Sequence, residues 1–240
     1  MNCEPIAIAH SCFREKFGIP RQPGLVRAAR GYLEMLPDFD RAEAFRGLDG
    51  YSHLWLLYDF HALPRGRDWK AKVRPPRLGG NQRIGVFATR SPFRPNPVGL
   101  SCVRFEGIDR DPGPTRLRIS GLDLLDGTPV FDIKPYVPYT DSLPDARAGF
   151  ADSAPGAVLE VTFEPAAEAA CQRYRQRWPE LRELITAVLS QDPRPAYHGD
   201  RPGRVYGMKL YDLDIRWRLD GGRATVLALE EIEVASWNGG

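Results

Sequence analysis

The chain has 240 residues, of which 42% are apolar and 27% charged, as is ordinary for a folded globular protein, so disordered and fibrous classes are excluded. Basic and acidic residues nearly balance, 33 against 31, and the net charge of +2 does not by itself indicate an anionic partner. The longest apolar run, Leu54–Tyr58, is far shorter than the roughly 20 residues that cross a bilayer, and the N-terminus lacks the pattern of an export signal. We therefore expect a cytoplasmic protein without a membrane partner.

Short β-branched and aromatic runs, bounded by Gly and Pro, dominate the first two thirds of the chain. The expected strands are Pro5–His10, Tyr51–Phe60, Ile84–Thr89, Val98–Ile108, Thr115–Leu124 and Pro129–Lys134. Strands in quick succession with few helical patterns between them predict a mainly β fold, a small antiparallel β-barrel. We assign this barrel domain to residues 1–152.

Alanine and charged residues replace glycine and aromatics beyond residue 152. The expected elements there are a strand at Ala157–Phe163, helices at Pro165–Arg177 and Pro179–Gln191, and alternating runs at Val205–Leu219 and Arg223–Val234. The turn Asp220–Gly222 suits a hairpin between the last two runs. Residues 153–240 are thus expected to form a smaller α+β domain.

Metal chemistry has little support in the sequence. None of the four cysteines belongs to a C-x-x-C pair. His53 and His61 lie on one predicted strand, on the same face as Trp55, but no spacing supplies a third ligand. We expect no metal.

Charge is one-sided between His61 and Arg104, where ten basic residues, eight of them arginines, stand against Asp68 alone. Aromatic residues such as Trp69 and Phe87 are interleaved with them. Arginine binds phosphate through paired hydrogen bonds, and aromatic rings stack on bases. This stretch could also be only a solvated loop, but its composition favours contact with an anion or a nucleic acid.

Three segments place many polar groups on a rigid backbone: Phe17–Leu25, Val86–Ser101 and Gly121–Tyr136. A loop with a purely structural role has no need of so many held polar groups, because each would cost desolvation if buried without a partner. These segments therefore predict a functional site. Its cofactor would not be bound in the Rossmann manner, since the chain has no G-x-G-x-x-G turn after a strand and no P-loop.

At these segments the chain resembles the TsaA-like family that contains TrmO, whose members use S-adenosylmethionine to methylate N6 of threonylcarbamoyladenosine next to the tRNA anticodon. The matching segments are Lys16–Leu25, Gly47–His61, Val73–Gly80, Gly85–Ser101 and Leu122–Tyr136, with Gln191–Tyr197 and Val205–Leu219 matching the C-terminal domain of the bacterial members. The resemblance implies a homodimer that binds S-adenosylmethionine at or near the dimer interface. It also implies the anticodon loop of tRNA as partner, threonine tRNA above all.

The resemblance further implies which residues form the cofactor wall. They are Gln22, Pro23, Gly24, His61, Ala62, Arg90, Leu100, Ser120, Gly121, Leu122 and Asp123. We expect these to bind the cofactor without help from residues 153–240, because the cofactor motifs end by Tyr136.

Methylation of N6 also needs a group that accepts its proton, since the N6 lone pair is conjugated with the purine and the carbamoyl group. The candidates are Asp123, Asp126, Asp132 and Tyr136. Asp132 lies on the opposite face from Phe131 and Ile133, so it either points at the site or pairs with an arginine as an anchor.

Arginine suits both the threonyl carboxylate and the phosphates of the substrate. The expected substrate contacts are Arg74, Arg77, Arg94, Asn96, Arg194 and Tyr197. Two alternatives stay open: a non-catalytic module that binds RNA or a nucleotide, and a methyltransferase with a small-molecule acceptor.

Overall fold

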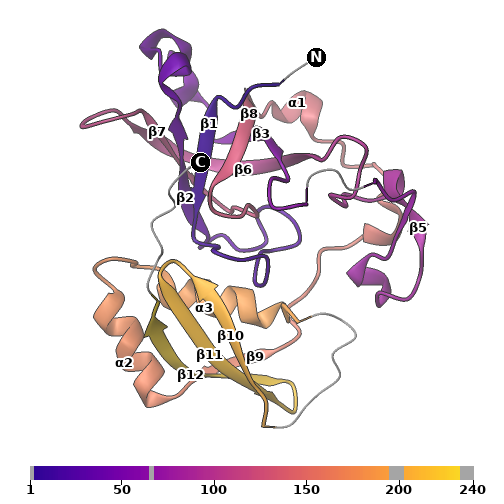
Figure 1. Ribbon diagram of the computed structural model, residues 1–240, viewed down its shortest axis with the longest axis vertical. Coiled ribbons are helices and arrows are strands. Elements are labelled where there is room, and N and C mark those ends of the chain that lie inside the picture. Colours follow the sequence, from indigo (N-terminus) through magenta and orange to yellow (C-terminus); the bar gives the residue numbers. More distant parts are fainter. Residues whose placement is uncertain (1–2, 65–67, 195–202, 233–240) are drawn as a thin grey trace.

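Six antiparallel strands in the first part of the chain close into a barrel (Figure 1). The computed structural model describes residues 3–64, 68–194 and 203–232. The barrel strands are β1 (Ala7–Ser11), β2 (Arg30–Met35), β3 (His53–Asp59), β6 (Val98–Asp109), β7 (Arg116–Ser120) and β8 (Thr128–Pro135). They neighbour one another in the order β1-β2-β7-β6-β3-β8. The predicted antiparallel barrel is confirmed.

Alternation along each strand decides which side chains fill the barrel. On β3, Leu54, Leu56 and Tyr58 are buried, whereas Trp55 and Leu57 between them are partly exposed. The predicted alternation is therefore confirmed for His53–Asp59, but His61 lies in the turn after the strand and not on its face. Each strand pairs with a neighbour on either side, so the sheet closes on itself, although residues 98–103 of β6 pair with β3 alone among the described strands.

The strand expected over Ile84–Thr89 is wrong beyond its first two residues. Only Ile84–Gly85 is extended, as β5, and it pairs with β4, Lys72–Val73. Val86–Ala88 then forms a 3-10 turn, closed by Thr89, whose amide (3.0 Å) and hydroxyl (2.7 Å) both donate to the carbonyl oxygen of Val86. A threonine hydroxyl that bonds a nearby carbonyl competes with strand pairing.

A four-stranded sheet with two helices forms the C-terminal part, which lies below the barrel in Figure 1. Its elements are β9 (Glu160–Phe163), α2 (Pro165–Tyr174), α3 (Leu181–Ser190), β10 (Val205–Leu210), β11 (Leu213–Asp220) and β12 (Arg223–Glu231). The strand order is β10-β11-β12-β9, and β9 runs parallel to β12. The predicted α+β character is confirmed, and the exact division at residue 152 stays a prediction.

The single alternating run expected over Val205–Leu219 is two strands in the structure. The break falls at Tyr211, which has a positive φ of 55°. Its amide donates to the carbonyl oxygen of Cys12 (2.8 Å), and its ring stacks on Trp178 with centroids 4.8 Å apart. Contacts with another part of the chain thus hold a turn that the local sequence does not signal.

Residues 12–25 form a junction segment between the barrel and the C-terminal part. Phe13 pairs with Leu210 of β10, and the Gln191 side-chain amide after α3 donates to the carbonyl oxygen of Leu25 (3.3 Å). Gly18 has a φ of +91°, and a Cβ there would lie 2.7 Å from the sulfur of buried Met208. The two parts therefore pack directly through this segment.

Buried side chains of both parts belong to one continuous hydrophobic cluster. Shorter elements connect the strands: α1 (Pro138–Asp141) and 3-10 turns at Pro37–Phe39, Ala42–Phe45, Leu48–Gly50, Pro76–Leu78 and Gly149–Ala151. Among the described residues, no helix has the length and apolar character needed to cross a membrane.

Candidate active site

A cavity of about 620 Å³ opens where β3 ends and β6 begins. Its wall comes from residues 16–23 of the junction segment, 55–63, 89–100 and 123–128. The three segments that the sequence singled out thus meet around one cavity. Its volume lies within the roughly 300–1,000 Å³ of typical ligand sites.

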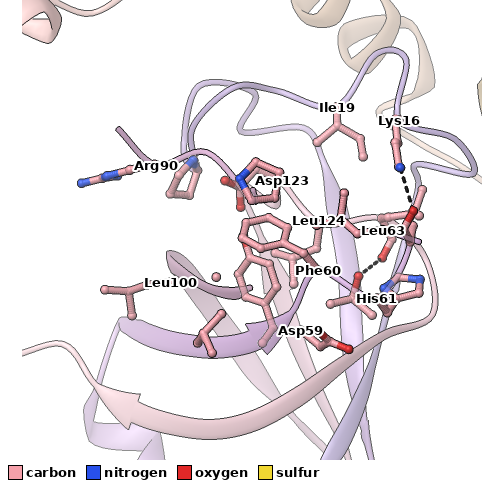
Figure 2. Close-up of a pocket in the computed structure, with 18 of the residues that line it drawn as sticks. Lys16, Ile19, Asp59, Phe60, His61, Leu63, Arg90, Leu100, Asp123 and Leu124 are labelled. Carbon is pink, nitrogen blue, oxygen red and sulfur yellow. Dashed lines mark hydrogen bonds between the residues drawn. The ribbon is translucent and has the colours of Figure 1, made fainter. Parts of the chain in front are cut away.

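Seven of the residues expected in the cofactor wall line this cavity. They are Gln22, Pro23, His61, Ala62, Arg90, Leu100 and Asp123. Figure 2 shows Asp123 and Phe60 near the middle, with Arg90 and Leu100 on one side and His61 on the other. Their role in cofactor binding stays a prediction, but the structure places them together.

The other four expected wall residues lie behind the cavity lining. The Gly24 amide donates to the carbonyl oxygen of Gly121 (2.8 Å), and a Cβ on Gly121 would lie 3.3 Å from the Gly24 Cα. Leu122 is fully buried, and the Ser120 hydroxyl donates to Glu106 (2.6 Å). These contacts hold the loop that carries Gln22 against the loop that carries Asp123.

Asp123 is the carboxylate with the most unusual environment in the cavity. Burial raises its pKa to about 6, while a hydrogen bond from Ser101 and the charge of Arg90 oppose the rise. The Ser101 hydroxyl donates to Asp123 Oδ1 at 2.6 Å and forms a second hydrogen bond, of 3.2 Å, with the hydroxyl of Tyr58. Ser101 is itself fully buried, so this carboxylate is fixed from inside the barrel.

Arg90 lies at the rim and is exposed. Its guanidinium donates to the side-chain oxygen of Gln22 at 2.5 Å, which joins the two loops across the cavity mouth. The turn before it is fixed by Thr89, whose hydroxyl also accepts a hydrogen bond from the Ser91 amide (3.2 Å). Arg90 is therefore held in place while its charge faces solvent.

His61 follows the end of β3 and is partly buried. Burial lowers its pKa, and the neighbouring charge of Asp59 opposes this shift. Lys16 donates to the carbonyl oxygen of Ala62 (2.8 Å), which ties the turn after β3 to the junction segment.

The remaining candidates for the proton acceptor lie outside the cavity lining. Asp126 pairs with Arg14 and accepts the Ser11 amide (2.9 Å), so it fastens the end of β1. Asp132 forms an ion pair of 2.8 Å with Lys134, a lysine where the sequence suggested an arginine.

Tyr136 is also outside the lining, but it lies one ring away from the cavity. Its ring centroid is 5.8 Å from that of Trp55, which does line the cavity. Its amide donates to the carbonyl oxygen of His53 (3.0 Å). Of the four candidates, only Asp123 lines the cavity.

The expected substrate residues of the barrel are scattered. Arg94 lines the cavity and donates to the carbonyl oxygen of Thr89 (2.7 Å). Arg74 and Asn96 are exposed beyond the lining. Arg77 instead donates to the carbonyl oxygen of Ser153 (2.5 Å), on the connection to the C-terminal part.

For the two residues of the C-terminal part that were expected to contact the substrate, Arg194 and Tyr197, the structure gives no evidence of an exposed position. Arg194 is 9% exposed and forms an ion pair of 2.8 Å with Asp192. Tyr197 lies outside the described residues.

Two cavity partners were missed in the sequence. Tyr58 lines the cavity, and Ser101 holds Asp123 from behind the wall. Ser101 carries a signal, because it is a polar residue at an inward position of an otherwise apolar alternation along β6. Among the described residues no group of three or more His, Cys, Asp or Glu side chains gathers as a metal site, and the absence of a metal stays a prediction.

Fold and site together define the class: an antiparallel β-barrel protein with a loop-built cavity that contains a half-buried carboxylate of raised pKa and an arginine at its rim. Residues 8–142 match the model of the tRNA-methyltransferase O N-terminal domain, and residues 156–232 match that of the TrmO C-terminal domain. The chain belongs to the tRNA-methyltransferase O family, which confirms the resemblance.

Curated relatives and a solved structure agree with this assignment. The chain is 48% identical to tRNA (adenine(37)-N6)-methyltransferase of Escherichia coli, over 95% of this chain and 97% of the relative. It is 53% identical to the putative S-adenosylmethionine-dependent methyltransferase RcsF of Pseudomonas aeruginosa, over 89% and 90% of the two chains. The crystal structure of TrmO from Pseudomonas aeruginosa superposes with a TM-score of 0.79 at 45% identity, covering 96% of this chain and 98% of the other.

Proposed function

We propose that the protein transfers a methyl group from S-adenosylmethionine to N6 of threonylcarbamoyladenosine at position 37 of tRNA, with threonine tRNA as the main substrate. As a member of the tRNA-methyltransferase O family, the protein is an S-adenosylmethionine-dependent methyltransferase of tRNA adenine. The threonylcarbamoyl group and the identity of the tRNA are the finer part of the proposal. The threonylcarbamoyl group is supported by Arg90 and Arg94 in the cavity lining, since arginine suits a threonyl carboxylate, whereas threonine tRNA follows from the family resemblance alone.

The residues of the cavity fit S-adenosylmethionine. Arg90 offers a guanidinium to its carboxylate, Phe60 and Phe93 offer aromatic faces to its purine, and carboxylates complement its positive charges. When bound, it supplies a methyl group activated by a sulfonium. The chain's own task is to position the acceptor nitrogen and to remove its proton.

The observation that carries the proposal is the position of Asp123 in the cavity lining together with its raised pKa. With a pKa of about 6 this carboxylate is mainly ionised at neutral pH, yet basic enough to accept a proton from N6 as the new N–C bond forms. The hydrogen bond from Ser101, whose hydroxyl also contacts that of Tyr58, fixes the orientation of the Asp123 carboxylate. Arg90 and Gln22 hold the two loops together at the mouth, so that cofactor and nucleotide meet in a fixed geometry.

The decisive experiment combines the purified protein with S-adenosylmethionine and tRNA from cells that lack this activity, followed by mass spectrometry of the digested nucleosides. We expect threonylcarbamoyladenosine to become one methyl group heavier. In Asp123→Asn, loss of the general base should slow the reaction by about 10²–10⁴. Asp126→Asn, the matched control outside the cavity, should keep a rate near that of the wild type once folded.

Three outcomes would contradict the proposal. Binding of cofactor and tRNA without transfer would favour a non-catalytic module. Methylation of a small molecule but not of tRNA would change the acceptor. Equal rates on tRNA with and without the threonylcarbamoyl group would remove the finer part alone.

We also infer a homodimer in the cytoplasm, where its tRNA substrate is found. Val98 and Leu100 at the cavity rim are 44% and 53% exposed, and a second copy would cover them. Sedimentation should give twice the monomer mass. A fully active monomer at nanomolar concentration would contradict the dimer.

A further inference from the structure

The strands β4 and β5 form an arm, residues 68–88, which lies around the β5 label in Figure 1. This arm carries two exposed aromatic rings. Trp69 and Phe87 stack on one another with centroids 6.0 Å apart and an angle of 25° between the rings. Even so, 47% of Trp69 and 71% of Phe87 are exposed to solvent. Large rings left in water beside a functional cavity mark an interaction surface.

Cations surround these rings. The guanidinium of Arg94 lies 5.7 Å from the centre of the Phe87 ring, and the Lys70 ammonium lies 4.7 Å from that of Phe93. Along the arm the sequence has five basic residues and one acidic residue. The surface therefore combines flat apolar faces with positive charge, a combination that matches single-stranded nucleic acid.

The aromatic arm is continuous with the active-site cavity. Beside that cavity lies a second hollow of about 330 Å³, lined in part by Trp69. Phe93 and Arg94 belong to the walls of both. If one base of an RNA loop is turned into the main cavity, its covalently linked neighbour is brought to the second hollow.

We propose that Trp69 and Phe87 form a stacking platform for the nucleobase next to the adenine that is methylated, while Lys70 and Arg94 contact its phosphates. The inference rests on the proposed function and adds the residues that recognise the RNA. The base must be unpaired, because a base inside a duplex has no free face to stack. The platform thus selects a loop and not a stem.

The test uses a synthetic anticodon stem-loop RNA and the full chain, with affinity measured by fluorescence anisotropy. Trp69→Leu keeps apolar bulk but loses the aromatic face, and we expect binding to weaken about tenfold, equivalent to about 1.4 kcal/mol. Phe87→Leu should act in the same direction, and Trp69→Phe should recover most of the loss. Tyr139→Leu removes a ring on α1 that is 91% exposed and lines neither hollow, and it should change nothing.

A second RNA, abasic at the nucleotide beside the target, identifies the base that stacks. The wild type should bind this RNA about tenfold more weakly, whereas Trp69→Leu should bind both RNAs equally, because base and ring act as one pair. Additive losses, or no loss in Trp69→Leu, would overturn the platform. So would a shift of Trp69→Leu from dimer to monomer, since the rings would then belong to an interface between copies.

Two controls separate this inference from the proposed function. Melting temperature and calorimetric binding of S-adenosylmethionine should be unchanged in Trp69→Leu, which excludes unfolding and damage to the cofactor site. A protein that shows the non-additive pair but transfers no methyl group would support the platform and contradict the proposed activity. If the wild type, Trp69→Leu and Phe87→Leu all methylate tRNA with equal efficiency, the platform is overturned and the proposed activity stands.

Discussion

The hydroxyl of Ser101 lies 2.6 Å from Oδ1 of Asp123 and donates a hydrogen bond to it. Ser101 is on the barrel wall and fully buried, whereas Asp123 faces the cavity. The barrel interior therefore sets the basicity of the one candidate proton acceptor in the cavity. This relationship can be tested directly through the pH dependence of the reaction.

Because Asp123 must be ionised to accept a proton, kcat/KM should rise with pH through about 6 in the wild type. Ser101→Ala removes a donor to the charged form, so the pKa of Asp123 rises and the midpoint moves to higher pH. One charge-assisted hydrogen bond corresponds to about one pH unit. Ser153→Ala removes a hydroxyl that donates to a carboxylate outside the cavity lining, that of Asp152 (3.4 Å), and should leave the midpoint in place. An unchanged midpoint in a folded Ser101→Ala protein would mean that another group titrates.

Arg90→Ala should weaken binding of S-adenosylmethionine by about tenfold or more, because it removes both a charge-assisted contact and the bond to Gln22 at the cavity mouth. Arg83→Ala removes one exposed positive charge from the same basic stretch and should cost far less. Isothermal calorimetry at two salt concentrations measures both. If both variants lose the same affinity and the loss vanishes at high salt, Arg90 acts only through its general positive charge and not through a specific contact.

Deletion of residues 153–240 should weaken cofactor binding, contrary to what the position of the motifs in the sequence suggested. Residues 16–23 of the cavity wall belong to the junction segment, which packs against Leu210 and Met208 of β10. Without β10, the segment that carries Gln22 loses these packing contacts and is no longer held at the cavity wall. Calorimetry on the truncated barrel tests this, and wild-type affinity in a folded fragment would refute it.

Gly18→Ala probes the same junction by one methyl group. The new Cβ would meet the Met208 sulfur at 2.7 Å in a closely packed core, and overpacking of this kind costs about 1–3 kcal/mol. Gly47→Ala has a similar positive φ of +80° but open space around the Cβ, so it controls for backbone strain alone. We expect a lower melting temperature and weaker cofactor binding in Gly18→Ala than in Gly47→Ala. If the two variants have the same melting temperature and the same affinity for the cofactor, the junction accommodates the extra methyl group without loss of stability.

Most barrel strands could be predicted from alternation, but β2 (Arg30–Met35) could not. Its buried alternating side chains are only Leu33 and Met35, too short a pattern to stand out. Gly31 beside them has no room for a Cβ, which would lie 2.1 Å from the carbonyl oxygen of His10. This strand is defined by its neighbours β1 and β7, and a single sequence does not show neighbours.

The loops of the site could be predicted, but not the choice among its carboxylates. Asp123 and Asp126 are three residues apart, yet one faces the cavity and the other pairs with Arg14. Which one faces inward depends on how the strands align. In the pairing of β3 with β6, Ser101 lies opposite Leu56 and Gly99 lies opposite Tyr58. This register brings the hydroxyls of Ser101 and Tyr58 together, and that of Ser101 donates to Asp123.

The shared hydrophobic core has a consequence for how the protein unfolds. Two separate family models describe the chain, yet buried residues such as Leu33 of the barrel and Ile185 of α3 belong to the same cluster. We expect a chain held together in this way to lose its structure cooperatively, in one thermal transition, which scanning calorimetry would show as a single peak. By linkage, a ligand that fills the cavity raises the melting temperature of the distant sheet as well as that of the barrel. Conversely, a destabilising substitution in the core of the C-terminal sheet should lower the fraction of molecules that are folded and able to bind a ligand, although it changes no residue of the cavity wall.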